Sequence, residues 1–223
     1  MATIDFEPIK LSYTQRVLKW IKEYNPPWIP IIILSSLLFF GLFANFVTGD
    51  PMANDLKARQ IAPFTDIHHI FGTDMLGKDM TARLIFGCRS VLLVTAPSII
   101  VAIFIGTAIG LIAGYTGRFT DTILMRITDA TLGFPSILVA MLLVTFVGTG
   151  YVGVIIAVTA TTWARFARMI RGEVLSVRER DFVTLAVILG VSPFMIMWRH
   201  LFPNVINTLM VMISLMIGQV VLL

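Results

Sequence analysis

Residues 90–114 have the sequence SVLLVTAPSIIVAIFIGTAIGLIAG, which contains no charged side chain. About 20 consecutive apolar residues are enough for a helix to cross the hydrocarbon core of a bilayer. Backbone polar groups cannot be left unpaired in lipid, so an apolar stretch of this length is expected to be helical. The stretch therefore predicts a membrane-spanning helix, and with it an all-α membrane protein.

The composition of the whole chain agrees with a membrane protein. Of its 223 residues, 57% are hydrophobic and only 13% are charged, which is too little charge for the surface of a soluble domain. The single cysteine, Cys88, excludes an internal disulfide and a metal site built from cysteines. Lysine and arginine form no dense patch interleaved with aromatic residues outside the apolar stretches, so a nucleic-acid partner is not expected.

Five apolar stretches predict a polytopic transmembrane helix bundle, with a surface facing membrane lipid. We expect residues 1–28 to form a cytoplasmic N-terminal segment and residues 29–223 to form the transmembrane domain. In the N-terminal segment Val17, Ile21 and Tyr24 recur at helical spacing, which fits either an interfacial amphipathic helix or a solvated lead-in. The predicted spans cover about residues 28–47, 90–114, 122–147, 151–166 and 205–223.

The basic residues predict the orientation of these spans. Lysines and arginines precede the first span, occupy the turn after the second and fill residues 167–204, whereas those of residues 48–89 are offset by aspartates. The positive-inside rule then places the N-terminus and residues 167–204 in the cytoplasm and the 48–89 loop outside. The chain is expected to be a multi-pass protein of the cytoplasmic membrane.

Glycine, proline and charged residues predict local features of the spans. Gly106, Gly110 and Gly114 recur every fourth residue, which leaves one helix face bare for close helix packing. Pro97 and Pro135 are expected to bend their helices. A charged side chain within a span needs a partner, and two such residues lie three apart on the third span, where a local ion pair or interfacial snorkelling is expected. These intramembrane charges are Arg126 and Asp129.

Two patterns in the 48–89 loop resemble ligand sites but lack the chemistry. Residues 72–79 are one residue short of a phosphate-binding loop, since Asp79 stands where a magnesium-binding hydroxyl is required. Asp74 would also place a carboxylate where backbone amides should bind phosphate. His68 and His69 are adjacent and have no third histidine near them, which favours a structured loop over a metal site. We expect no cofactor and no bound metal.

Residues 167–204 contain two short helical patterns around a hinge. The apolar stretch 182–189 ends at Gly190, and Ser192-Pro193 is a helix start, because serine caps a helix and proline suits its first turn. A second short helix is expected to end at Arg199-His200. Both helices are too short to span a bilayer and are rich in apolar residues, so they either pack within the chain or dock in the groove of a separate cytoplasmic protein.

The residues from Asp181 to Gly190, continuing to Asn204, resemble the "EAA" coupling loop of binding-protein-dependent ABC importer permeases. That pattern has Glu-Ala-Ala, then a glycine after three residues and a later proline after a hydrophobic residue. Here Thr184-Leu185-Ala186 stand in place of Glu-Ala-Ala, and Ala186, Gly190 and Pro203 keep the pattern. The resemblance implies a coupling segment within residues 182–204, formed by Phe182, Thr184, Leu185, Ala186, Leu189, Gly190, Pro193, Arg199, His200 and Pro203.

Further motifs resemble the C-type permease subunit of dipeptide and oligopeptide importers, and extend over most of the chain from about Pro30. They include residues 69–74, 110–115, Phe134-Pro135 and Trp163 with the arginines that follow it. The resemblance implies a type I importer fold, a second permease subunit, cytoplasmic subunits that hydrolyse ATP and an extracytoplasmic solute-binding protein. Since permeases for nickel and other small solutes share this subunit type, they are the alternative substrates.

Two other classes of function compete with an importer. An ATP-independent channel or secondary transporter would show paired broken helices in two repeats. An enzyme would need a nucleophile and a base at bilayer depth, and the histidines lie in loops. The chain is therefore expected to be a transport component and not an enzyme. A similar permease has one more span, so the resemblance also implies that a sixth span is missing from this chain.

Overall fold

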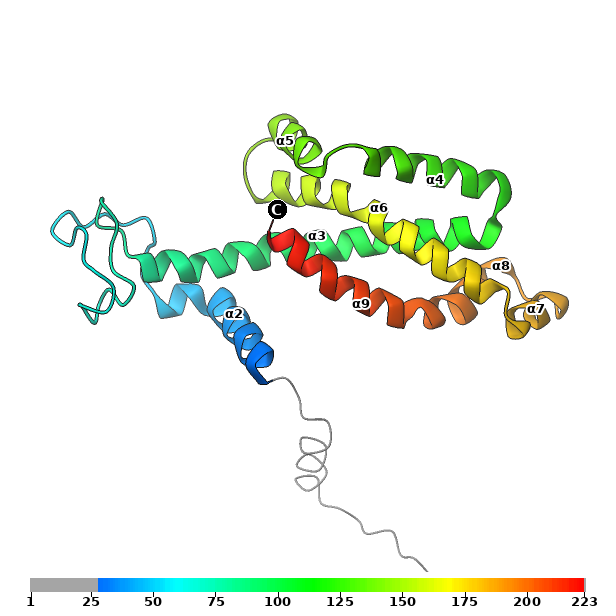
Figure 1. The fold of residues 1–223 in the computed structure, drawn as a ribbon, viewed down its shortest axis with the longest axis horizontal. Helices are drawn as coiled ribbons and strands as arrows, with labels where there is room; N and C mark the ends of the chain where they lie inside the picture. Colours follow the sequence, from blue (N-terminus) through cyan, green and yellow to red (C-terminus); the bar gives the residue numbers. More distant parts are fainter. Residues whose placement is uncertain (1–27, 223) are drawn as a thin grey trace, which may run out of the picture. The chain divides into compact units, whose positions relative to one another are not determined.

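The computed structural model describes residues 28–222, which are almost entirely helical (Figure 1). The predicted amphipathic lead-in around Val17 lies outside the described residues. The chain divides into two compact units, Met1–Phe86 and Gly87–Leu223, which are described in turn. The elements are α2 (Trp28–Val47), α3 (Met80–Thr116), α4 (Arg118–Gly133), α5 (Ser136–Val147), α6 (Tyr151–Arg178), α7 (Asp181–Ile188), α8 (Pro193–Met195), the π-helical turn η1 (Ile196–Leu201) and α9 (Phe202–Val221).

Three helices in the described residues are long and apolar enough to cross a membrane: Trp28–Val47, Met80–Thr116 and Pro193–Val221. A fourth span results if the bent pair α4 and α5 is counted together. The prediction of five spans therefore exceeds what the helices satisfy by length and composition. The difference is α6, where the predicted span 151–166 lies in a longer helix that continues through several arginines to Arg178.

The predicted span 122–147 is a broken helix and not a continuous one. Helices α4 and α5 meet at an angle of 91°, with the break at Phe134 and Pro135. A residue before proline is pushed out of the helical region, and Phe134 is extended, with φ −93° and ψ 143°. The predicted bend at Pro135 is thus confirmed, whereas Pro97 lies inside the uninterrupted helix α3.

In the first unit, tight turns order the loop that follows α2. Gly72 and Gly77 both have φ +75°, and a Cβ on Gly77 would lie 1.7 Å from the carbonyl oxygen of Asp55. The Asp74 carboxylate accepts hydrogen bonds from the backbone N–H groups of Leu76 (2.8 Å) and Lys78 (3.0 Å). These bonds explain the glycines and the aspartate of the motif that resembles a phosphate-binding loop, because the carboxylate uses the amides that a phosphate would need.

The same contacts give Asp74 a pH-dependent role in the loop. The backbone hydrogen bond from Lys78 is the largest cause of a pKa of Asp74 below its ordinary value; desolvation, the next largest effect, opposes it, and the hydrogen bond from Leu76 and the charges of Arg83 and Lys78 lower the pKa further. A lowered pKa means that the charged form favours the folded loop. The resulting stabilisation is present at neutral pH and is lost as the pH falls through the lowered pKa of Asp74.

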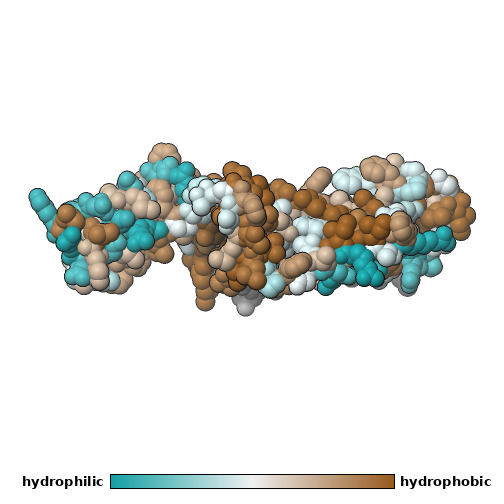
Figure 2. Space-filling view, turned by 90° about the horizontal axis from the view of Figure 1, so that it is seen from above, coloured by the Kyte–Doolittle hydropathy of each residue, from teal (hydrophilic) through white to brown (hydrophobic). Residues whose placement is uncertain are grey.

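In the second unit, α6 is the central helix, between α4 and α5 on one side and α9 on the other (Figure 1). Its fully buried side chains Phe166, Ile170 and Val174 are the middle of the core. In Figure 2 this unit shows a broad brown area of apolar side chains, whereas the loop residues of the first unit are largely teal. Apolar side chains thus lie both in the core and on the surface, as a protein in lipid requires.

Helices α3 and α6 run in the same direction, as contacts along their length show. Ser90 Oγ lies 3.2 Å from the hydroxyl of Tyr151, and Arg178 Nη1 donates to the carbonyl oxygen of Gly114 at 3.4 Å. Between these ends, Thr159 Oγ1 donates to the carbonyl oxygen of Ser98 at 3.3 Å. Parallel α3 and α6 agree with a serial topology in which the second and fourth predicted spans cross in one direction.

The predicted close packing of the glycine face is confirmed. A Cβ on Gly106 would lie 2.5 Å from the carbonyl oxygen of Trp163, and one on Gly114 would lie 2.7 Å from Val174 Cγ1. Gly110 faces Ala167 and Ile170 in the same way. Three glycines at four-residue spacing therefore let the backbone of α3 approach α6 more closely than any side chain would allow.

We expect Gly110→Ala to destabilise the protein by about 1–3 kcal/mol, the usual cost of overpacking a core. The added Cβ would lie 2.8 Å from both the carbonyl oxygen of Ala167 and Ile170 Cβ. The thermal unfolding midpoint of the detergent-solubilised protein measures the effect. Gly172→Ala on α6 is the matched control, since its Cβ would meet nothing within 4 Å. Equal midpoints for the two variants would contradict this account of the packing.

Candidate functional site

Helix α7 is a short helix whose two ends are fixed by backbone hydrogen bonds. At its start, Arg180 is extended and its carbonyl oxygen accepts from the N–H of Val183 at 3.0 Å. At its end, the N–H groups of Gly190 and Val191 donate to the carbonyl oxygens of Val187 (3.0 Å) and Ala186 (3.1 Å). This pair of bonds is a Schellman motif, which requires a residue with positive φ, and Gly190 has φ +75°. The predicted hinge glycine is confirmed as the residue that ends the helix.

One face of α7 is packed and the other is exposed. Val183 and Ala186 are buried in the core cluster that includes Val174 and Val177 of α6. The other apolar side chains of the helix and its end are exposed by 38–75%, and they are Phe182, Leu185, Val187, Ile188 and Leu189. The helix is thus anchored to α6 through two small side chains and presents an apolar surface, which we call the α7 knob (Phe182, Leu185, Ile188 and Leu189).

After α7 the chain turns directly into the last helix. Ser192 Oγ accepts a hydrogen bond from the N–H of Met195, and Pro193 occupies the first turn, so the predicted helix start is confirmed. The predicted second short helix is not separate, however, because residues Pro193–Val221 form one helix. The helix that contains the predicted span 205–223 begins earlier than Val205, since Arg199 and His200 lie within the π turn η1 and the helix continues through them.

Pro203 explains why the turn before α9 is widened. Proline has no N–H, so the carbonyl four residues earlier has no α-helical donor. The N–H of Phe202 bonds instead to the carbonyl oxygen of Met197, and Asn204 Nδ2 donates to the carbonyl oxygen of His200 at 2.7 Å. In the sequence Pro203 suggested the start of a helix, whereas in the structure the π turn η1 accommodates it within a helix that has already begun.

The structure brings most of the predicted coupling residues together at one end of the bundle. The rings of Phe182 and His200 lie with centroids 6.4 Å apart, which places the start of α7 beside η1. Ile196 and Leu201 of η1 are fully buried in the same cluster as Val183. Thr184, Arg199 and Pro203 are exposed. Sequence reasoning missed Val183, whose role is only visible once its burial against α6 is known.

Helix α6 supports α7, and arginines of α6 form contacts with α4 and α9. Arg171 forms a two-pronged pair with Asp121 of α4, with Nε to Oδ1 at 2.5 Å and Nη2 to Oδ2 at 2.6 Å. Arg168 pairs with Asp129 of α4, and Arg165 donates to Gln219 of α9. The side chains that anchor α4 to α6 thus come from distant parts of the chain.

These pairs correct one of the two alternatives expected for Arg126 and Asp129, the local ion pair, and leave interfacial snorkelling of Arg126 as a prediction. In the structure the partner of Asp129 is Arg168, and the Arg126 side chain is exposed. The three-residue spacing on one helix suggested the local pair, but in the structure Arg168 of α6 is the arginine that contacts Asp129. Asp121 and Asp129 lie eight residues apart on α4, whereas Arg168 and Arg171 lie three apart on α6, so sequence spacing gave no signal for either pair.

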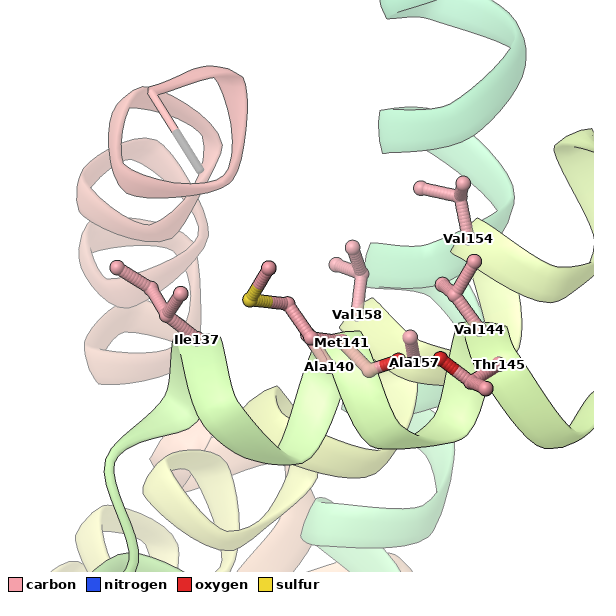
Figure 3. Close-up of a pocket in the computed structure, with 8 residues that line it drawn as sticks. All are labelled: Ile137, Ala140, Met141, Val144, Thr145, Val154, Ala157 and Val158. Carbon is pink, nitrogen blue, oxygen red and sulfur yellow. Dashed lines mark hydrogen bonds between the residues drawn. The ribbon is translucent and has the colours of Figure 1, made fainter. Parts of the chain in front are cut away.

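A hollow of about 400 Å³ lies between α5 and α6. Figure 3 shows Ile137 and Met141 of α5 and Val158 of α6 pointing to the same side. Thr145 is the polar residue of the lining, and its hydroxyl already donates to the carbonyl oxygen of Met141 at 2.8 Å. With no charged residue in its lining, the hollow is suited to apolar contact and not to selective binding of an ion.

A comparison with protein families matches residues 106–223 to the binding-protein-dependent transport system inner membrane component. The matched region contains α4 to α9, and hence the α7 knob and the arginine pairs. The chain belongs to this family of transport permeases. Its fold is that of the type I ABC importer permease, as the all-helical architecture and the α7 segment led us to expect.

Individual relatives agree with the family match. The dipeptide transport system permease protein DppC of Alkalihalophilus pseudofirmus is 31% identical over 212 residues, which are 95% of this chain and 69% of the relative. The oligopeptide permease OppC of Haemophilus influenzae is 33% identical over 85% of this chain and 63% of its own length. The nickel permease NikC of Escherichia coli is 34% identical over 86% and 69%. The chain thus spans about two thirds of the length of these permeases.

Membership in a permease family agrees with the expectation of a transport component of the membrane. The structure also shows where the chain departs from the family pattern and where it keeps it. Thr184 replaces the expected glutamate at an exposed position of α7, whereas Ala186 and Gly190, which keep the pattern, occupy the buried face and the Schellman turn. Two of the three retained positions therefore serve packing and the geometry of the helix end.

Proposed function

We propose that the chain is the membrane-spanning permease subunit of an ATP-driven peptide importer, acting with a second permease, cytoplasmic ATP-binding subunits and an extracytoplasmic solute-binding protein. On this proposal the N-terminus and the α7 knob lie in the cytoplasm, and residues 48–89 lie outside. ATP is hydrolysed by the partner subunits, and this chain converts their movement into a change of access across the membrane.

The α7 knob is the observation that supports the proposal. An apolar patch of this kind on a soluble face normally marks a site of protein interaction. Its buried side is fixed to α6, and α6 contacts α4, α5 and α9. A partner that pushes on α7 therefore acts on the centre of the bundle. The mode is that of an amphipathic helix laid in an apolar groove of the partner.

Peptides are favoured as the substrate because the relatives named above include permeases for dipeptides and oligopeptides. The permease NikC is named for nickel, which keeps nickel as a second candidate.

The test is co-expression of the chain with a second permease and ATP-binding subunits from the same genome, followed by purification through a tag on this chain. The ATP-binding subunits are expected to co-purify, and labelled dipeptide uptake into proteoliposomes is expected to require both ATP and the binding protein. Retention of no ATP-binding subunit would overturn the importer proposal. ATP-dependent uptake of nickel that dipeptides do not inhibit would overturn the choice of substrate.

A further inference from the structure

A groove lies between α3 and the last helix in the second unit, and among the described residues its lining has no charged side chain. On α3, the lining residues Phe104, Ala108 and Ile112 recur every fourth residue, two positions out of step with the glycine face that α6 covers. All three are exposed. On the last helix, Phe194 and Trp198 line the other wall and are exposed by 72% and 60%. The groove is thus an apolar surface apart from the α7 knob and from the hollow between α5 and α6.

Thr107 is the threonine of this lining, and it is only 6% exposed, yet its hydroxyl has no hydrogen-bond partner among the described residues. Several other helical hydroxyls bond to their own backbone. Ser98 and Thr116 of α3 each donate to the carbonyl oxygen four residues earlier at 2.7 Å, and the fully buried Thr128 of α4 does so at 2.8 Å. A buried polar group without a partner is costly. Threonine in a helix has two rotamers, so the Thr107 hydroxyl can turn to a partner in the groove.

The depth of Thr107 in the membrane decides which partners can reach it. It lies about 10 Å along the helix from Gly114, where the uncharged stretch 90–114 ends. A stretch of this length crosses the hydrocarbon core, so lipid headgroups and bulk water do not reach that position. Acyl chains reach it but carry no hydrogen-bonding group. The partner is therefore a second membrane helix, since such helices pair hydroxyls across their interfaces.

The concave shape of the groove bears on which protein supplies that helix. Two copies of this chain in a closed pair would bring groove against groove, because a two-fold interface uses the same patch on both sides. Two concave surfaces leave space between them, whereas one helix fits between two others by packing its ridges into their grooves. A contact between the groove and a different face of a second copy would not close into a pair. The second permease of the proposed importer supplies a helix without either difficulty.

We propose that this groove is the docking site for a membrane-spanning helix of the second permease subunit, which presents a hydrogen-bond acceptor to Thr107. The inference rests on the proposed function, which supplies the partner. Phe104 and Trp198 are the main apolar contacts, since exposed aromatic residues commonly anchor interfaces, and Ala108 lets the backbone of the partner approach α3. The last helix also carries η1, which lies beside α7. A helix held in the groove therefore connects the second permease with the coupling segment of this chain.

Photo-cross-linking in the co-expressed complex tests which helix lies in the groove. Benzoylphenylalanine in place of Phe104 is expected to cross-link to the second permease, detected through separate tags on the two chains. Ile105 is the matched control position, because it is the next exposed residue of α3 and does not line the groove. Successive helix residues point about 100° apart, so its cross-link should be about fivefold weaker or less.

The outcomes of this experiment separate the docking site from the proposed function. If the second permease co-purifies but Phe104 cross-links only to lipid, to a second copy of this chain or within the chain, the docking site is overturned and the importer proposal stands. Equal yields at Phe104 and Ile105 would overturn the docking site as well. If no second permease co-purifies, both proposals fail.

Removing the hydroxyl tests the role of Thr107. Thr107→Val keeps the shape of the side chain and is expected to lower the affinity between the two permeases about 3–10-fold, the effect of one hydrogen bond between membrane helices. Energy transfer between labelled subunits, followed on dilution of the detergent-solubilised complex, measures this affinity. Thr107→Ser keeps the hydroxyl and should restore most of it. Thr128→Val is the control, because it removes a buried hydroxyl that bonds within its own helix.

The stability of the isolated chain separates loss of docking from misfolding. Thr107→Val breaks no hydrogen bond among the described residues, so its thermal unfolding midpoint is not expected to fall. An unchanged affinity between the permeases in Thr107→Val would overturn the proposed contact with Thr107. An equal loss of affinity in Thr128→Val would do the same, because the effect would then not be specific to the groove.

Discussion

Replacing Ile188 by aspartate is expected to lower the affinity of the permease for its ATP-binding partner by about 100-fold or more. Ile188 is 75% exposed on the α7 knob, so the change costs the isolated chain little. In the proposed complex the same side chain lies in an apolar groove, where an unpaired carboxylate is strongly unfavourable. The measurement is the amount of ATP-binding subunit retained by the tagged permease, together with peptide-stimulated ATPase activity.

Thr184→Glu is the control for charge on the same helix. Thr184 is exposed, and glutamate is the residue that the coupling-loop pattern has at this position. We expect this variant to retain the ATP-binding subunit at least as well as the wild type. If Thr184→Glu were as damaging as Ile188→Asp, added negative charge would explain the loss. The apolar contact of the knob would then not be the binding interaction.

The sequence predicted those parts of the fold that depend on local chemistry. An apolar run predicted α2 with the bounds found in the structure, Trp28–Val47. Gly190 and Ser192 predicted a helix end and a helix start, because positive φ and side-chain capping are properties of single residues. The glycine face of α3 was predicted for a similar reason, since the spacing alone places three bare positions on one side.

Features that depend on contacts between distant segments were predicted poorly. The charges of α6 suggested a span that ends near residue 166; the structure shows that the helix itself continues to Arg178, and that Asp121 and Asp129 of α4 pair with two of its arginines. Pro203 suggested a new helix, but whether a missing N–H ends a helix or widens one turn depends on the packing around it. Burial of Ile196 and Leu201 keeps η1 in line with α9.

The coupling site was predicted in outline for the same reasons. Spacing located the short apolar helix and its terminal glycine, but not which of its sides is buried. Val183 and Ala186 lie three apart and meet α6, which leaves the knob residues free. The side that α6 covers follows from the direction in which the chain leaves Arg178, and this direction is set by the turn at Glu179 and Arg180.

Arg171→Ala is expected to destabilise the protein by about 2–3 kcal/mol, because it leaves Asp121 partly buried without its partner. The two side chains are 32% and 16% exposed, so the pair is neither a surface ion pair nor fully buried, and the expected cost lies between those two cases. For a protein of this size the thermal unfolding midpoint should fall by about 4–12 °C. The measurement is made on the detergent-solubilised protein.

A double-mutant cycle assigns this loss to the pair. Asp121→Ala alone should cost a similar amount, and the double variant should cost clearly less than the sum, with a coupling energy of about 1–3 kcal/mol. Arg171→Lys keeps the charge but loses the two-pronged geometry, so it should fall between wild type and Arg171→Ala. Arg126→Ala removes an exposed arginine from α4 and is expected to have a small effect. Additive single effects would mean that each residue acts alone.

The same pair bears on how α7 acts on the bundle. Arg171 lies on the helix that leads into α7, and Asp121 lies on the half of the broken span before Pro135. With the pair intact, α4 moves with α6 when the knob is pushed, and the break at Pro135 separates α4 from α5. We therefore expect Arg171→Ala complexes that still retain the ATP-binding subunit to hydrolyse ATP with less peptide uptake per ATP. Unchanged uptake per ATP would show that α4 does not take part in the transmission.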